Sequence, residues 1–180
     1  MLKASRAWAR QQAGFSMIEA LVAAVVLSFG LLALAGFQLR VLSDSVGASN
    51  KNVAVQLAGD IADRIRANLV AGVAADSPYR VDAWSLAADT APSPTCAGAA
   101  ANCTAAQLAA QDMWAWKRAV AQALPGGQGN VVAKADAGGL LFVHVAWDEP
   151  AVVNPVPPDA GWACPAGKAC QEVIVAVPQP

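Results

Sequence analysis

The feature that most constrains the fold of this chain is a long apolar run near the N-terminus. From Ala20 to Leu39 no charged side chain occurs. The residues before it carry Lys3, Arg6 and Arg10, with no acidic side chain up to Gly14. Twenty helical residues span about 30 Å, the thickness of a bilayer core. Because short basic segments beside a membrane helix stay in the cytoplasm, we expect one spanning helix with a cytoplasmic N-terminus and an exported remainder.

Two simpler interpretations compete with this one. A secretory signal would place a small-residue cleavage site after an apolar region of roughly 7 to 15 residues, but here the run is longer and Gly14 precedes it. A plain membrane anchor leaves Glu19 unexplained, because a charge costs about 2.5 to 3.5 kcal/mol at the bilayer centre, and such residues usually mark a function.

Glu19 requires a cationic partner that its own helix does not offer. No Lys or Arg lies three or four residues away, the spacing at which side chains share a helix face. Cleavage after Gly14 would create an α-ammonium at Phe15, close to Glu19 of a neighbouring copy. We therefore expect the carboxylate to set the register between subunits.

The order of basic leader, Gly14, Phe15, Ser16-Met17-Ile18, Glu19 and apolar helix resembles the class III signal of type IV pilins and pseudopilins. The resemblance implies that a prepilin peptidase cleaves after Gly14, that the new N-terminal Phe15 is N-methylated, and that Glu19 pairs with a neighbouring subunit's amino terminus. It also implies partners: the major pilin, other minor pilins, the prepilin peptidase, the inner-membrane assembly platform, and membrane lipid before assembly.

The apolar run continues into an amphipathic pattern. Apolar residues recur at four-residue spacing, and the helix is predicted to reach about Asn68: Val53, Leu57, Ile61, Ile65 and Leu69. Gly30 and Gly36 each weaken a helix by about 1 kcal/mol relative to alanine and permit local unwinding. We thus expect a cleaved leader over 1–14, a transmembrane or filament-core helix over 15–39, its amphipathic continuation over 40–70, and an exported head over 71–180.

The head is expected to combine a short helix with an antiparallel sheet. Residues 71–104 are rich in Ala, Pro, Ser and Asp and are predicted to form a surface loop. A helix is predicted from Thr104 to Leu124, with Thr104 as N-cap and Pro125-Gly126-Gly127 as its stop. Strands are predicted at 131–135 and 140–147, joined by a glycine-bearing turn, and at 172–177. The proline-rich residues 149–158 are predicted to form a surface loop. This is an α+β order, as in pilins, and we expect the sheet to pack on the later half of the long helix.

Four cysteines follow the apolar run. On the exported side of a membrane they indicate two disulfides, most simply Cys96 with Cys103 and Cys164 with Cys170, although three connectivities are possible. Structural zinc favours ligands two to four residues apart, so these wider spacings argue against a metal site. Neither pair has the Cys-x-x-Cys spacing of a redox centre.

The remaining candidates do not indicate catalysis. His144 is the only histidine, and we expect it to be half-buried on a strand. Of Trp114 and Trp116, two residues apart on a helix, we expect one in the core and one at an interface. We find no catalytic motif, and we expect no cofactor and no enzymatic activity. The formal net charge of −1 and the lack of a basic cluster outside the leader argue against direct nucleic-acid binding.

A second resemblance narrows the family. The segments 112–117 and 124–129, with two tryptophans and a Pro-Gly-Gly stop, resemble the PilV group of minor pilins, the type IV pilus modification proteins. The expectation is a minor type IV pilin, inserted once in the inner membrane with its head in the periplasm, and then exposed on the pilus and cell surface. The sequence does not distinguish among roles of the pilus in motility, adhesion and DNA uptake. The alternatives are a minor pseudopilin of type II secretion, or a membrane-tethered binding module or enzyme that keeps its leader.

Overall fold

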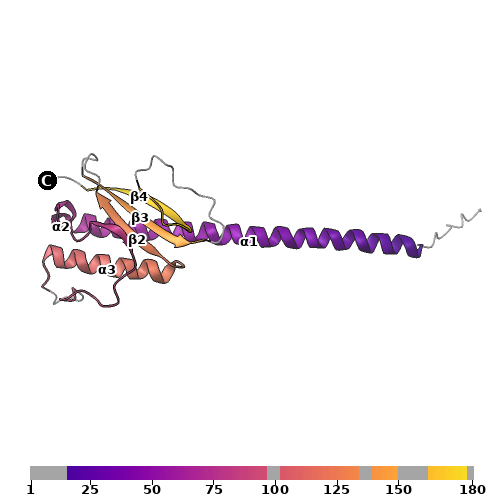
Figure 1. Cartoon of the computed structure of the whole chain (residues 1–180), viewed down its shortest axis with the longest axis horizontal. Coiled ribbons are helices and arrows are strands. Elements are labelled where there is room, and N and C mark those ends of the chain that lie inside the picture. The colour runs from indigo at the N-terminus through magenta and orange to yellow at the C-terminus, as the bar shows by residue number, and fades with distance from the viewer. Residues whose placement is uncertain (1–15, 97–101, 134–138, 150–161, 178–180) are drawn as a thin grey trace, which may run out of the picture. The chain divides into compact units, whose positions relative to one another are not determined.

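The computed structural model describes residues 16–96, 102–133, 139–149 and 162–177 (Figure 1). The chain forms two compact units, divided after Ser45. The helices are α1 (Met17–Ala67), α2 (Leu69–Val73) and α3 (Ala105–Ala123), and the strands are β1 (Val81–Ser85), β2 (Gln128–Ala133), β3 (Leu140–Asp148) and β4 (Lys168–Ala176). The architecture is the predicted α+β, pilin-like one, with a long N-terminal apolar helix and a small four-stranded antiparallel sheet.

Helix α1 ends at Ala67, within one residue of its predicted end. It remains helical through Gly30 and Gly36, so the local unwinding that these glycines permit is not seen. At its C-terminal end Asn68 leaves the helical conformation, with φ −114° and ψ 62°. Its side-chain amide donates to the carbonyl of Ala105 (2.8 Å), and this bond ties the end of α1 to the start of α3.

The four strands form one antiparallel sheet in the order β1-β2-β3-β4. The predicted hairpin is confirmed, with β2 beginning three residues earlier than expected. Strand β4 also begins earlier, at Lys168 rather than at residue 172, because it pairs with β3 along the whole length of both strands. The earlier boundary includes Cys170 in the strand.

The prediction of an unbroken loop over 71–104 is wrong. Strand β1 lies within it and pairs with β2 through Val81 opposite Val131 and Ser85 opposite Gly129. Five residues are too few to show a clear alternation in the sequence, and the register shifts between the two pairs. Tertiary pairing rather than local pattern therefore defines this strand.

The core of the second unit lies between one face of the sheet and the two longer helices. Small residues on α1, including Ala54, Ala58 and Ala62, allow close approach beside Ile61 and Ile65. The sheet contributes alternate residues of its strands, as expected for a strand with one face on the core: Val131, Leu141, Val143, Val145, Trp147 and Val175. This confirms the predicted packing of the sheet on the later part of α1.

Helix α3 begins and ends where the sequence predicts. The Thr104 hydroxyl accepts from the Gln107 backbone N–H (3.2 Å), and the Gln107 side chain accepts from the Thr104 N–H (2.9 Å). After Leu124 the chain turns through Gly126, whose φ of 58° favours glycine. The predicted loop over 149–158 lies outside the described residues except for Glu149.

Candidate functional site

The candidate site begins at the N-terminal end of α1. Gly14 and Phe15 lie outside the described residues. The Ser16 carbonyl accepts from the N–H groups of Glu19 (3.0 Å) and Ala20 (3.2 Å), and so closes the first turn. Glu19 is exposed in that first turn, where the helix dipole favours a negative charge. Among residues 16 onward that the structure describes, no Lys or Arg forms an ion pair with Glu19.

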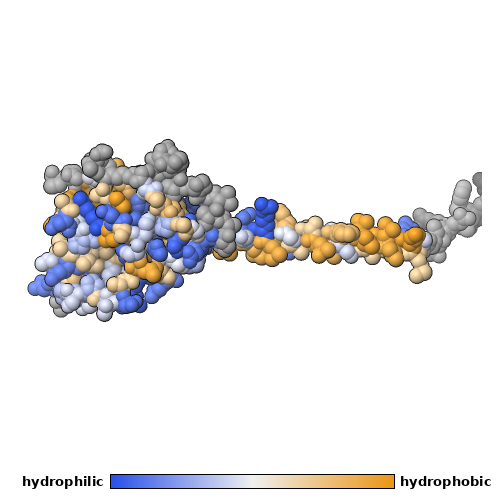
Figure 2. Space-filling model, in the orientation of Figure 1, coloured by the Kyte–Doolittle hydropathy of each residue, from blue (hydrophilic) through white to orange (hydrophobic). Residues whose placement is uncertain are grey.

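An apolar surface follows Glu19 along the helix. The large apolar side chains of residues 17–42 are exposed, and Figure 2 shows this part of the chain mostly in the colours of hydrophobic residues. Within the described chain, α1 is the one helix long and apolar enough to cross a membrane. Soluble monomers rarely expose contiguous apolar areas of more than a few hundred Å², so this surface requires lipid or other protein chains around it.

Both local cysteine pairs form disulfides. Cys96 bonds to Cys103 and Cys164 to Cys170, with Cα atoms 5.9 Å and 6.0 Å apart. The second bond fastens the residues before β4 to the strand itself. Each short ring restricts the unfolded chain, an effect of about 2 kcal/mol for loops of this length.

The two tryptophans of α3 differ in burial, and the prediction that one of them lies in the core is confirmed. That the other lies at an interface stays a prediction. Trp116 is buried, and its indole N–H donates to the carbonyl of Leu57 on α1 (2.8 Å). Trp114 is half-buried, donates to the Ala88 carbonyl (2.8 Å), and lies under the Arg118 guanidinium, 5.2 Å from the ring centroid. Trp116 therefore joins helix to helix, whereas Trp114 holds the loop after β1.

A polar cluster that the sequence analysis missed joins three elements. The Tyr79 hydroxyl donates to the Asp112 carboxylate on α3 (2.6 Å), and the Arg64 guanidinium on α1 donates to the same carboxylate (3.2 Å). Burial, and then the bond to Asp112, raise the pKa of Tyr79. The tyrosine therefore stays a neutral donor. The one available sequence clue is that Tyr79 is the only tyrosine.

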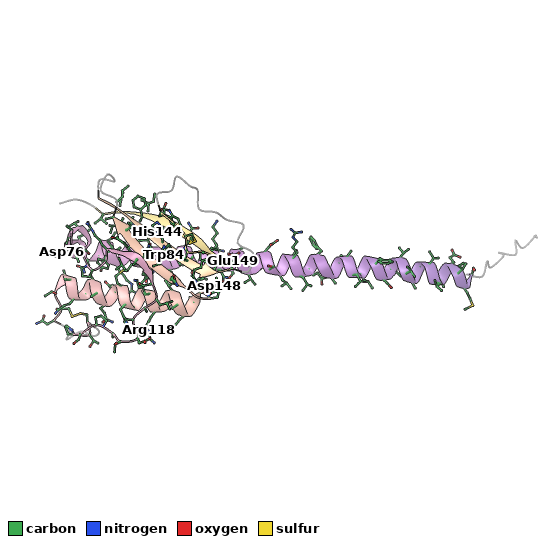
Figure 3. The ribbon with its side chains drawn as sticks, viewed as in Figure 1. Asp76, Trp84, Arg118, His144, Asp148 and Glu149 are labelled. Atoms are coloured by element: carbon green, nitrogen blue, oxygen red, sulfur yellow. A yellow bond between two sulfur atoms is a disulfide. The ribbon has the colours of Figure 1, made fainter. Side chains whose placement is uncertain are left out.

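His144 lies on a strand, as predicted, but it is fully buried rather than half-buried. It lies directly opposite Asn130 on β2 and Glu172 on β4 in the sheet register. Its Nδ1 is 2.7 Å from Asn130 Oδ1, and its Nε2 is 2.8 Å from Glu172 Oε2. Figure 3 labels His144 and Trp84 in the region of the sheet. Their ring centroids are 6.0 Å apart. The contacts of His144 with Asn130 and Glu172 could not be predicted, because the sequence of one strand does not show which residues lie opposite it on the neighbouring strands.

Two family models match the chain. The model for the prokaryotic N-terminal methylation motif covers residues 9–35, and so includes Gly14, Phe15 and Glu19. The model described as type IV pilin Tt1218 covers residues 36–114. No curated protein and no solved structure matches the chain significantly.

Three features together define a pilin-type protein: the long apolar helix, the antiparallel sheet that follows it in the chain, and the methylation motif. The chain is a member of the type IV pilin superfamily. Membership indicates a structural rather than an enzymatic protein, and the motif and apolar helix together support anchoring in a membrane.

Proposed function

We propose that the chain is a minor type IV pilin, processed after Gly14 and incorporated into the pilus or its priming complex through the start of α1. The observation that carries the proposal is Glu19: an exposed carboxylate in the first helical turn, directly before an apolar surface. Removal of the basic leader would leave an ammonium at Phe15 as the matching cation on a neighbouring subunit.

The resemblance to type IV pilins implies an order of events. Before assembly, lipid would cover the apolar residues of α1, with the leader cytoplasmic and the head periplasmic. The prepilin peptidase would cut after Gly14 and the amino group of Phe15 would be methylated, which keeps its positive charge. The assembly platform would then move the helix from lipid into a bundle of pilin helices, where the Glu19 carboxylate has its partner.

The head contributes stability and surface rather than chemistry. Two disulfides and a core shared by α1, α3 and the sheet suit a domain that works outside the reducing cytoplasm. The resemblance of residues 112–129 to the PilV group supports the minor-pilin assignment. The partners proposed are the major pilin and other minor pilins.

Replacement of Glu19 tests the proposal. We expect Glu19→Ala to insert and to be trimmed normally, because the helix becomes more apolar, but to enter fibres at a level at least about tenfold below wild type, the loss that corresponds to 1.4 kcal/mol. Glu19→Asp keeps the charge and should retain part of the incorporation. The measurement is the amount of the chain in sheared surface fibres relative to the amount in membranes.

Ser28→Ala is the matched control for this experiment. Ser28 is exposed on the same helix and donates only to the carbonyl of Ala24, one turn back, so its replacement should leave incorporation unchanged. Wild-type incorporation of Glu19→Ala would count against the assigned role of the carboxylate. Recovery of the chain with type II secretion components instead of pilins would favour the pseudopilin alternative.

A further inference from the structure

A row of three side chains crosses the face of the sheet that is turned away from the helices. Asn130, His144 and Glu172 occupy directly paired positions on β2, β3 and β4. The His144 side chain is 1% exposed and that of Glu172 is 27% exposed. An ionisable ring is thus enclosed between an amide and a carboxylate that water reaches.

The two hydrogen-bond partners of the ring favour a doubly protonated imidazole. The Asn130 side-chain N–H donates to the carbonyl of Asp82 on β1 (3.1 Å), so its oxygen is the atom that faces His144 Nδ1. Glu172 presents a carboxylate oxygen to Nε2. Both partners are acceptors, and a neutral imidazole has only one N–H. The geometry is satisfied when both ring nitrogens are protonated.

Two tryptophans cover the ring. Trp162 stacks on the imidazole with centroids 4.2 Å apart and planes at 25°. Trp84 lies at 6.0 Å from His144, and its indole N–H donates to the carbonyl of Ala163 (3.0 Å). The face of an aromatic ring attracts a cation. A positive charge on His144 therefore strengthens the contact that holds residues 162 and 163 to the sheet.

Within the described strands β1, β3 and β4, the other charged groups of this face are paired or exposed. Asp148 and Lys168 lie on the same face of the sheet, each four residues from the row along its strand. They are opposite each other in the register, and the Lys168 ammonium donates to the Asp148 carboxylate. The side chain of Asp82 on β1 is exposed. Among the described residues, Glu172 is the acidic side chain that contacts the imidazole.

We propose that His144 is held as an imidazolium in the folded head, and that this charge latches the segment of Trp162 and Ala163 onto the outer face of the sheet. The latch is a pH-sensitive element. If one proton is lost, one of the two ring nitrogens presents a lone pair to an acceptor oxygen at hydrogen-bond distance, and Trp162 stacks on a neutral ring. The segment then loosens as the pH rises.

The test is a titration of the ring by nuclear magnetic resonance, using the full chain labelled with ¹⁵N-histidine in detergent micelles. Because the chain has a single histidine, the signal needs no assignment. We expect a protonation midpoint above the ~6.5 of free histidine. In Glu172→Gln, which keeps the shape but removes the charge, the midpoint should fall by about one pH unit or more.

Asp148→Asn is the control, since it removes a carboxylate of the same strand that does not contact His144; it should leave the midpoint unchanged. A wild-type midpoint at or below about 6.5 would overturn the proposal. So would a midpoint that Glu172→Gln does not lower, or that Asp148→Asn lowers as much.

Urea unfolding at pH 6 and pH 9 gives a second readout. A group whose protonation midpoint is raised by folding stabilises the fold fully below its unfolded value and loses that contribution as the pH rises through the folded midpoint. Wild type should therefore lose more stability between pH 6 and pH 9 than Glu172→Gln does. Equal losses in the two proteins would contradict the latch.

Discussion

At the scale of single residues, the packing around the Trp116 ring determines which side chains fit next to it. Its ring lies against the backbone of Gly129 on β2, and a Cβ added there would collide with the ring. The ring cannot easily move aside, because its N–H is bound to the carbonyl of Leu57. Packing against the Trp116 ring therefore requires glycine at position 129, whereas its backbone φ is one that other residues also adopt.

We expect Gly129→Ala to lower the free energy of unfolding by about 1 to 3 kcal/mol, the usual cost of an overpacked core. Gly59→Ala is the matched control, because a Cβ on this α1 residue meets open space; it should stabilise the chain by about 0.5 to 1 kcal/mol. Urea unfolding of both variants in detergent measures the difference. Wild-type stability of Gly129→Ala would show that the ring is free to move.

Residue roles could be predicted from the sequence where a local rule defines them. Thr104 and Gln107 form the predicted capping box, and the cysteines pair within short loops as the simplest connectivity requires. Partners distant in sequence were not predictable. Tyr79 meets Asp112 across 33 residues, and His144 meets Glu172 across 28. Only the register of the folded sheet and the packing of the helices bring such residues together.

At the scale of elements, periodicity predicted the helices better than the strands. α1 and α3 are long enough to show a repeating apolar face, and the C-terminal end of α1 and both ends of α3 agree with the prediction within one residue. β1 has five residues and a shifted register, and its sequence neighbours are typical of loops. Pairing with β2 stabilises β1, and the sequence of β1 itself contains no pattern that indicates this pairing.

The N-terminus of α3 offers a test at this scale. Thr104→Ala removes the hydroxyl that accepts from the Gln107 N–H and should cost about 1 kcal/mol of stability. Thr104→Ser keeps the oxygen and should cost much less. Thermal unfolding followed by circular dichroism compares the two. Equal melting temperatures for the alanine and serine variants would mean that the capping bond contributes little.

At the scale of the whole molecule, the two units have different requirements. Residues 17–45 expose an apolar helix surface that needs lipid or neighbouring helices, whereas the unit from Val46 onward has its own core and both disulfides. The family and the fold class could be predicted from the sequence because the residues of the N-terminal motif lie close together in the sequence and in a fixed order. The proposed pairing of Glu19 with Phe15 lies between subunits, so one chain does not contain it.

The central claim, cleavage after Gly14 to release an assembly-competent helix, is tested most directly by the N-terminus of the chain recovered from sheared surface fibres. Mass spectrometry should find N-methylated Phe15 as the first residue, and Gly14→Val, whose side chain crowds the bond to be cut, should remain unprocessed in membranes and absent from fibres. Chain that enters fibres with residues 1–14 still attached would contradict the account.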